Sequence, residues 1–415
     1  MPHETPLIAT IVAGIGLAFV FGTIANRLRM PPLVGYLAAG IFIGPHTPGF
    51  VADQSLATEL AELGVILLMF GVGLHFSLKD LLSVRAIAVP GAIIQIAVAT
   101  AMGAALAWWM KWPIGAALVF GLALSVASTV VLLRAMQERH LMQTERGRIA
   151  VGWLIVEDLA MVLTLVLLPA LASLLGTSDA ASQDPLALRF GLNIWGVLGL
   201  TLVKLLVFVA FMLIVGRRVI PWVLQYVADM GSSELFRLAV LAIALCVAFG
   251  AAQLFGVSLA LGAFFAGMIL SESELSHRAA EETLPLRDAF AVLFFVSVGM
   301  LFEPAILLQE PLPILGTLAI IVLGKAAIAF LIVLAFGYPL RTALTISASL
   351  AQIGEFSFIL AELGIGLHLL PEHGRDLILA GAILSILLNP LAFAVVDWLW
   401  RGDVEPLKGE GANEA

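Results

Sequence analysis

Two adjacent carboxylates in the middle of a long apolar run are the residues best suited to chemistry. Glu157 and Asp158 lie within Gly152-Trp-Leu-Ile-Val-Glu-Asp-Leu-Ala. A charge at the centre of a bilayer costs at least about 2.5–3.5 kcal/mol on insertion scales, so such residues are functional candidates. Neighbours on a helix differ by about 100°, so the two acids should have different partners. Close carboxylates raise each other's affinity for protons, which suits proton-for-cation exchange. A pair of neutral, hydrogen-bonded structural acids is the alternative.

A lysine occupies a similar position in another apolar run. Lys325 lies within Val322-Leu-Gly-Lys-Ala-Ala. A buried ammonium group needs an anionic partner or a lowered pKa, and Glu157 is the expected partner. The alternative is that Lys325 only neutralises a structural acid. Lys204 is also deep in an apolar run, but its long stem can reach the membrane surface, so we expect it to be structural.

Polar side chains cluster at matching places in two further apolar runs. The run 113–136 contains Ser125, Ser128 and Thr129, and the run 340–366 contains Ser347, Ser349, Gln352, Gly354, Glu355 and Ser357. Interrupted helices in transporters place unwound carbonyls and helix ends at the midplane, where they coordinate ions. We expect the first three residues to bind a cation, and Gln352 and Glu355 to support the crossing of the two runs. Hydroxyls bonded back to helix carbonyls are the alternative, and Glu355 could bind either free backbone amides or the ion.

Composition identifies the kind of elements that must position these residues. Hydrophobic residues make up 61% of the 415-residue chain and charged residues only 12%. A soluble fold cannot hide so much apolar surface, so an ordinary soluble enzyme is excluded. The net charge of −8 argues against a nucleic-acid partner, and the single cysteine, Cys246, excludes a disulfide framework. There is no Walker loop, so we expect no cofactor, only transported ions.

Thirteen apolar runs are candidates for membrane-spanning helices, which need about 20 apolar residues each. The fold class is therefore an all-α polytopic membrane protein. The runs lie near residues 6–26, 32–44, 58–76, 86–109, 113–136, 148–174, 190–216, 233–253, 257–270, 286–302, 312–336, 340–366 and 374–400.

Basic residues predict the orientation of these thirteen spans. With the N-terminus outside and the C-terminus inside, 16 basic residues lie on the cytoplasmic side and 3 (Lys111, Arg189 and Arg375) lie outside. The cytoplasmic ones are Arg27, Arg29, Lys79, Arg85, Arg134, Arg139, Arg146, Arg148, Arg217, Arg218, Arg237, Arg278, Arg287, Arg341, Arg401 and Lys408. This asymmetry is what the positive-inside rule requires.

Similar segments recur at a nearly constant distance along the chain. Gly-Tyr-Leu-Ala-Ala-Gly at 35–40 matches Gly-Ala-Phe-Phe-Ala-Gly at 262–267, an offset of 227. An offset of 226 relates 68–76 to 294–302 and also superimposes the two polar runs. Corresponding spans are seven helices apart, so the two halves run in opposite directions. Inverted repeats are typical of secondary transporters. Chance similarity among Gly- and Ala-rich helices is the alternative.

Four motifs carry a resemblance to a known family. They are Pro31-Pro-Leu-Val-Gly-Tyr-Leu-Ala-Ala-Gly-Ile-Phe-Ile-Gly-Pro, Leu259-Ala-Leu-Gly-Ala-Phe-Phe-Ala-Gly, Phe294-Phe-Val-Ser-Val-Gly-Met and Gln352-Ile-Gly-Glu-Phe-Ser-Phe. On these the chain resembles, over about residues 6–400, the membrane domain of the cation:proton antiporter 2 family, most closely its Kef-type branch.

The resemblance implies the sodium/proton antiporter fold with two crossed, half-unwound helices. Its ion-binding Asp corresponds to Asp158 and its core lysine to Lys325, whereas Glu157 departs from the family's Asp, Asn or Gln. It also implies a homodimer in a bacterial inner membrane. In the domain organisation so implied, the transmembrane domain covers 1–402, with scaffold helices at about 6–76 and 233–302. Core helices lie at about 86–174 and 312–400, the linker helix at about 190–216, and a polar cytoplasmic tail at 403–415.

Kef-type proteins often continue into a cytoplasmic Rossmann-like regulatory domain. This chain ends soon after its last predicted span, so a regulatory domain or subunit is either missing or was never present. Gating through such a domain is therefore not expected to carry over.

The sequence thus predicts exchange of protons for K⁺ or Na⁺ by alternating access, and the resemblance implies that the movement is of the elevator type. Asp158 would bind cation and proton competitively. The nearest alternative is a channel-like K⁺ efflux protein without obligatory proton coupling. More distant alternatives are an organic-anion symporter, which an acidic midplane disfavours, and a membrane sensor or scaffold without transport.

Overall fold

The computed structural model describes residues 6–28, 30–48, 51–74, 78–142, 144–172, 194–273 and 275–399, and their regular structure is entirely helical. The first helices are α1 (Pro6–Arg27), α2 (Pro32–Ile43), α3 (Gln54–Leu74), α4 (Leu78–Trp109), α5 (Ile114–Ser125), α6 (Thr129–Glu138) and α7 (Glu145–Ala172). Next come α9 (Ile194–Phe211), the π-helical turn η2 (Met212–Gly216), α10 (Arg217–Asp229), α11 (Ser233–Phe255), α12 (Leu259–Ser271) and α13 (Ser276–Met300). The last are α14 (Ile306–Gln309), α15 (Pro311–Ala319), the π-helical turn η3 (Ile320–Gly324), α16 (Lys325–Ala335), α17 (Leu340–Leu350), α18 (Glu355–Gly366) and α19 (Glu372–Leu399).

Over the described residues, each of the thirteen predicted spans overlaps a helix or consecutive helices. Residues 75–76, 173–174, 190–193 and 400 of these spans and the predicted tail at 403–415 lie outside the described residues. Among the described residues, nine helical segments are long and apolar enough to cross a membrane, and the bent pair α17–α18 makes a tenth. The helices α2 and α12 are apolar but shorter. The protein is therefore an all-helical polytopic membrane protein. The full count of thirteen crossings and the orientation stay predictions.

Two helices extend beyond the apolar runs in which they were predicted. The linker was expected to end at residue 216, but the helix continues through η2 and α10 to Asp229. The last predicted scaffold span was expected to begin at 286, but α13 begins at Ser276. Charged residues end the apolar run in both cases, yet a helix satisfies its own backbone hydrogen bonds and can continue beyond the bilayer.

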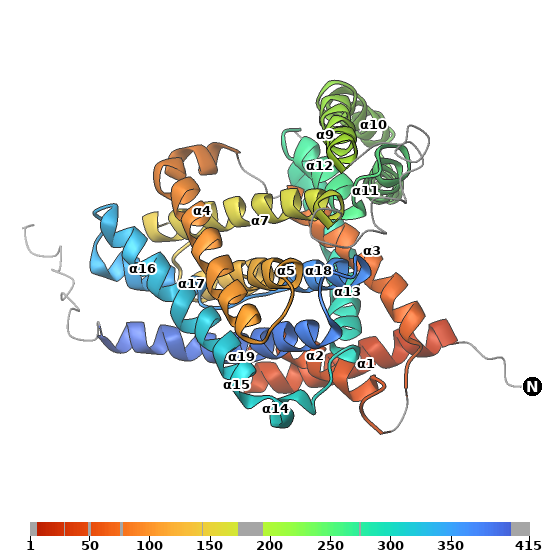
Figure 1. Cartoon of the computed structure of the whole chain (residues 1–415). Helices are drawn as coiled ribbons and strands as arrows, with labels where there is room; N and C mark the ends of the chain where they lie inside the picture. The colour runs from red at the N-terminus through yellow and green to blue at the C-terminus, as the bar shows by residue number, and fades with distance from the viewer. Residues whose placement is uncertain are drawn as a thin grey trace, which may run out of the picture.

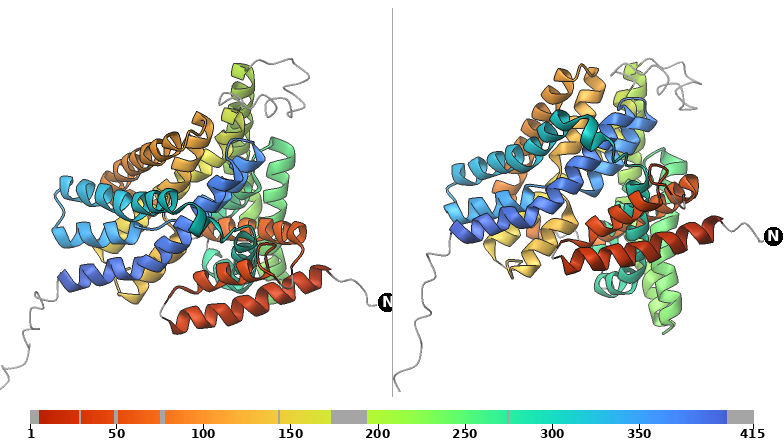
Figure 2. Two further views of the ribbon diagram at one scale, coloured as in Figure 1. Left: turned by 60° about the horizontal axis from the view of Figure 1, so that its bottom comes forward. Right: turned by 90° about the horizontal axis from the view of Figure 1, so that it is seen from below.

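The helices pack in two groups (Figures 1 and 2). In one group, α3 packs against α12 and α13, α2 packs against α1 and α13, and α11 packs against α12. In the other, α4 packs against α5 and α7, α18 against α5, α17 against α16, and α19 against α15 and α17. One hydrogen bond between the groups joins Arg134 Nη2 of α6 to Asn26 Oδ1 of α1 at 3.1 Å.

Two close helix contacts in the first group repeat at the predicted offsets. A Cβ on Gly40 of α2 would overlap the Val296 carbonyl of α13. A Cβ on Gly267 of α12 would overlap the Phe70 carbonyl of α3. Positions 40 and 267 differ by 227, and positions 70 and 296 differ by 226. The same offsets relate the contact of Gly299 with Leu37 to that of Gly73 with Phe264. Glycine is required here because backbone touches backbone.

Both polar runs are broken helices that cross each other. The helix α5 ends at Ser125 and α6 starts at Thr129, leaving 126–128 non-helical. The helix α17 ends at Leu350 and α18 starts at Glu355, with a bend of 42°. Since α18 packs on α5 and α17 packs on α6, the two breaks meet near the centre of the second group (Figure 1).

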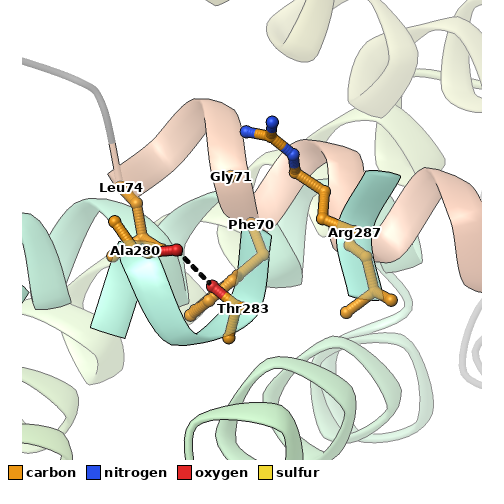
Figure 3. A pocket seen from close by; sticks show the side chains of 7 residues that line it. Phe70, Gly71, Leu74, Ala280, Thr283 and Arg287 are labelled. Carbon is orange, nitrogen blue, oxygen red and sulfur yellow. Dashed lines mark hydrogen bonds between the residues drawn. The ribbon is translucent and has the colours of Figure 1, made fainter. Parts of the chain in front are cut away.

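A small cavity lies elsewhere, between α3 and α13 (Figure 3). Its volume is about 10 Å³, enough for about one water molecule. Arg287 lies across Gly71 at its edge, and the Thr283 hydroxyl donates to the Ala280 carbonyl at 3.3 Å. Neither Glu157 nor Asp158 lines this cavity, so it is separate from the carboxylate pair near the broken helices.

Candidate functional site

Asp158 lies in the middle of α7 and is only 3% exposed. The Thr129 hydroxyl, at the start of α6, donates to Asp158 Oδ2 at 3.1 Å. Asp158 Oδ1 is buried and has no hydrogen-bond partner among the described residues. A buried oxygen without a partner is costly, so it marks a place where a cation or proton would be stabilised.

Glu157 is fully buried, and both of its oxygens are occupied. Gln95 of α4 donates from Nε2 to Glu157 Oε1 at 2.5 Å. The Ala127 N–H donates to Glu157 Oε2 at 2.9 Å. Since Ala127 belongs to the break between α5 and α6, Glu157 replaces a backbone acceptor that the interrupted helix lacks. The two neighbouring acids therefore face different partners, as the helix geometry predicted.

Lys325 is fully buried at the start of α16, directly after the π-helical turn η3. Its Nζ donates to the Gln352 carbonyl at 3.0 Å, in the break between α17 and α18. Glu157, the predicted partner, is not within ion-pair distance, but the two charges interact electrostatically at longer range. The Lys325 ammonium group therefore binds a carbonyl in the break between α17 and α18, while the Glu157 carboxylate binds an N–H in the break between α5 and α6.

The Gln352 side chain joins the two breaks directly. Its Oε1 accepts from the Ser128 N–H at 2.8 Å. Its Nε2 donates to the carbonyls of Ser128 and Ser349, each at 3.2 Å. One side-chain amide thus satisfies the Ser128 N–H, which has no helical acceptor at the break, and adds a second donor to the Ser128 carbonyl, which also accepts from the Leu132 N–H at 3.1 Å.

Glu355 and Ser128 hold the starts of the two half-helices together. Ser128 is the N-cap of α6, where its Oγ accepts from the Val131 N–H at 3.4 Å. The same hydroxyl donates to Glu355 Oε2 at 3.0 Å. Glu355 is the first residue of α18, and a carboxylate is favoured at a helix N-terminus. A Cβ on Gly354 would overlap the Ser128 side chain, so only glycine allows this approach.

The side chains of other predicted residues lie outside this network of bonds. Ser125, expected to bind the cation, donates its hydroxyl to the Leu122 carbonyl within α5 at 2.7 Å. Ser347 and Ser349 bond back to helix carbonyls in the same way. Lys204 is half-buried on α9. In the described part of the chain, no group of three or more His, Cys, Asp or Glu side chains could hold a metal ion.

Two residues of the site were not predicted from the sequence. Gln95 is a single amide in the apolar run 86–109, and Asn389 of α19 donates from Nδ2 to the Ala348 carbonyl at 2.8 Å. A lone amide in a long apolar run is itself a signal, because an amide buried without a partner is unfavourable.

The chain matches known transporters along nearly its whole length. The family model "Sodium/hydrogen exchanger, transmembrane" matches residues 15–396. The putative cation/proton antiporter YbaL of Escherichia coli is 64% identical over 415 residues, which is 100% of this chain and 73% of that protein. The K(+) efflux antiporter 4 of Arabidopsis thaliana is 34% identical over 392 residues, 94% of this chain and 64% of that protein.

A solved structure has a similar fold. The sodium proton antiporter MjNhaP1 of Methanocaldococcus jannaschii matches with a TM-score of 0.62 at 18% identity, covering 94% of this chain and 98% of that one. Together with the family match and the helical membrane architecture, this leads to one conclusion: the chain belongs to the sodium/hydrogen exchanger family of membrane transporters.

Proposed function

We propose that this protein exchanges K⁺ or Na⁺ for protons by alternating access, with Asp158 binding the cation and the proton in competition. The observation that carries the proposal is the buried Asp158 carboxylate, of which one oxygen is bonded to Thr129 and the other has no partner among the described residues. A single carboxylate that accepts either ion couples the two fluxes without a second binding site.

In the proposed cycle, Asp158 loses its proton and takes up the cation. Thr129 Oγ1 lies next to the carboxylate and is the nearest candidate for a further ligand. Ser125 and Ser128 are candidates only if their present hydrogen bonds, to Leu122 and Glu355, are exchanged for the ion. Protonation of Asp158 on the other side of the membrane then releases the cation.

Glu157, Lys325, Gln352 and Glu355 support this site by holding the interrupted helices. Glu157 and Lys325 each bond a backbone group that lies in a break, and Gln352 and Glu355 each bond Ser128 of the other broken helix. Irregular backbone at membrane depth is tolerated only when its polar groups are satisfied in this way. The site is therefore in place before the cation arrives, which lowers the cost of binding.

Further parts of the proposal follow from the sequence and the packing. The repeats would run in opposite directions, with the N-terminus outside and the C-terminus inside. The group containing α4–α7 and α15–α19 would move as an elevator against the other group, which would form a homodimer in a bacterial inner membrane. The E. coli relative is longer than this chain, so a regulatory domain or subunit is a candidate partner.

Proton flux in proteoliposomes tests the proposal. Added K⁺ or Na⁺ should drive proton movement with the wild-type protein, and Asp158→Asn should abolish it. Asp397→Asn, at an exposed carboxylate paired with Arg139, is the matched control and should keep the flux. Cation flux without stoichiometric proton counterflux would favour the channel-like K⁺ efflux alternative. Undiminished exchange in Asp158→Asn would overturn the assignment of the site.

A further inference from the structure

The structure contains a buried amide that the proposed cycle does not use directly. Gln95 lies on α4, is fully buried, and donates from Nε2 to Glu157 Oε1 at 2.5 Å. Its own Oε1 is buried without a hydrogen-bond partner among the described residues. Burying a half-satisfied amide is unfavourable, so the residue is poorly explained as packing alone.

The bond from Gln95 is the first of a chain that ends at the cation site. The other oxygen of Glu157 accepts from the Ala127 N–H at 2.9 Å, so Glu157 links Gln95 to the backbone of the break between α5 and α6. Two residues later, Thr129 begins α6 and bonds Asp158 at 3.1 Å. The position of Thr129 relative to Asp158 therefore depends on where Glu157 holds the break.

The approach of α4 to α7 is built for this contact. One turn before Gln95, a Cβ on Gly91 would overlap the ring of Trp153. Trp153 is in turn one helical turn before Glu157, so the two pairs lie on the same faces of their helices. The glycine lets the helices come close enough for the amide to reach the carboxylate.

We infer that Gln95 is a positioning residue for cation binding, which acts by fixing Glu157 and, through it, the break that presents Thr129 to Asp158. This inference rests on the proposed function. Without Gln95, the break occupies its binding-competent arrangement for a smaller fraction of the time. Apparent affinity falls by that fraction, while transport by the loaded protein is affected less.

The test compares Gln95→Met with Thr100→Val in proteoliposomes. Methionine keeps the length of the side chain and removes the donor. Thr100 is on the same helix, and its buried hydroxyl has no partner among the described residues, so it is a matched control. We expect Gln95→Met to raise the KM for the driving cation about tenfold or more, the effect of losing a hydrogen bond to a charged group. The maximal rate should change less than the KM, and Thr100→Val should leave both unchanged. An unchanged KM, or a loss of maximal rate alone, would overturn the inference.

A double-mutant cycle separates this inference from the proposed function. In a Glu157→Gln background, Gln95→Met should have a much smaller further effect on the KM and on the thermal unfolding midpoint in detergent, because the two residues act as one unit. Additive effects on both quantities would overturn the inference. Absence of cation-driven flux in the wild-type protein would instead overturn the proposed function, and the unfolding midpoints would still report whether Gln95 and Glu157 are coupled.

Discussion

Each of the two broken helices has backbone groups without a partner in its own helix, and the side chains that bind these groups are mainly acceptors at one and donors at the other. The break between α5 and α6 has its N–H groups bound by acceptors, Glu157 at Ala127 and Gln352 at Ser128. In the second broken helix, carbonyls are bound by donors, Lys325 at Gln352 in the break and Asn389 at Ala348 in the last turn of α17. Glu157 and Lys325 thus have equivalent roles with opposite charge. Each forms a hydrogen bond with a backbone group in a helix break, and the two side chains do not form an ion pair with each other.

The same comparison supports the proposal that Asp158, and not its neighbour Glu157, binds the transported ion. Glu157 has a donor at each oxygen, whereas Asp158 has a donor at only one. One backbone N–H of the helix break and the amide of Gln95 occupy Glu157, so in the proposed cycle it does not compete for the ion. Four substitutions would sharpen or break this comparison.

The largest effect is expected from Lys325→Met. It leaves the Gln352 carbonyl without its donor and the buried Glu157 charge without its compensating cation. The two charges are not in direct contact, so the cost should be below the roughly 3–5 kcal/mol that breaking a buried ion pair typically costs. It adds to the loss of the hydrogen bond to the Gln352 carbonyl. Thermal unfolding in detergent should show a large drop in the midpoint, and Lys325→Met with Glu157→Gln should recover part of it. A double variant as unstable as the sum of both single ones would contradict the opposite roles of the two charges.

Gln352→Leu should come next, because the amide supplies three hydrogen bonds to the two breaks. The Ser128 N–H loses its acceptor, while the Ser128 carbonyl keeps the Leu132 N–H at 3.1 Å. A buried backbone group left unsatisfied costs about 1–3 kcal/mol. We expect a lowered unfolding midpoint together with a weakened apparent affinity for the driving cation, measured from the concentration dependence of proton flux. Ser347→Ala is a control on the same broken span, since its hydroxyl bonds only within α17. A Gln352→Leu variant as stable as this control would show that the breaks are held by other groups.

Gly354→Ala should have a smaller effect. The added Cβ would overlap the Ser128 side chain and separate α18 from the start of α6. Overpacking of this kind costs about 1–3 kcal/mol, and rotation of the Ser128 hydroxyl cannot relieve it, because the nearest atom is the Ser128 Cβ. The unfolding midpoint should fall, and Gly366→Ala, where nothing lies within 4 Å of the added Cβ, should not reproduce the fall. Equal effects of the two substitutions would mean that backbone entropy and not crowding dominates.

The smallest effect is expected from Asn389→Ala, which removes one donor from the end of α17. A single neutral hydrogen bond contributes about 1 kcal/mol. The loss should be visible in the unfolding midpoint, with little change in the KM for the cation. A rise in the KM as large as that expected for Gln95→Met would mean that both breaks position the cation equally, contrary to the comparison drawn above.

Local composition was enough to predict the apolar runs, their interruptions and the polar clusters, because each depends only on residues that are close together in the sequence. The same holds for the repeated segments, whose reciprocal glycine contacts match offsets of 227 and 226. Helix ends at Asp229 and Ser276 could not be predicted, since charged residues mark the edge of the bilayer and not the end of a helix.

The partners in the site were harder to predict than its members. Lys325 and Glu157 were recognised as charges needing compensation, and a side-chain partner was expected for each. Lys325 instead bonds a backbone carbonyl, and Glu157 bonds a backbone N–H together with the side chain of Gln95. Any residue type supplies backbone groups, so these partners leave no trace in the sequence. Gln95 was missed because a single amide does not change the hydropathy of a 32-residue helix.

The reciprocal glycine contacts of α2 with α13 and of α12 with α3 have a practical consequence. Where main chain rests on main chain, no side chain can change rotamer to let the helices slide. Spectroscopic labels on α2 and α13 should therefore keep a constant separation whether or not cation is present. Such a pair gives a constant reference distance. A second pair of labels, one on each side of the Arg134–Asn26 bond, would then report any displacement of one helix group relative to the other as a change in distance.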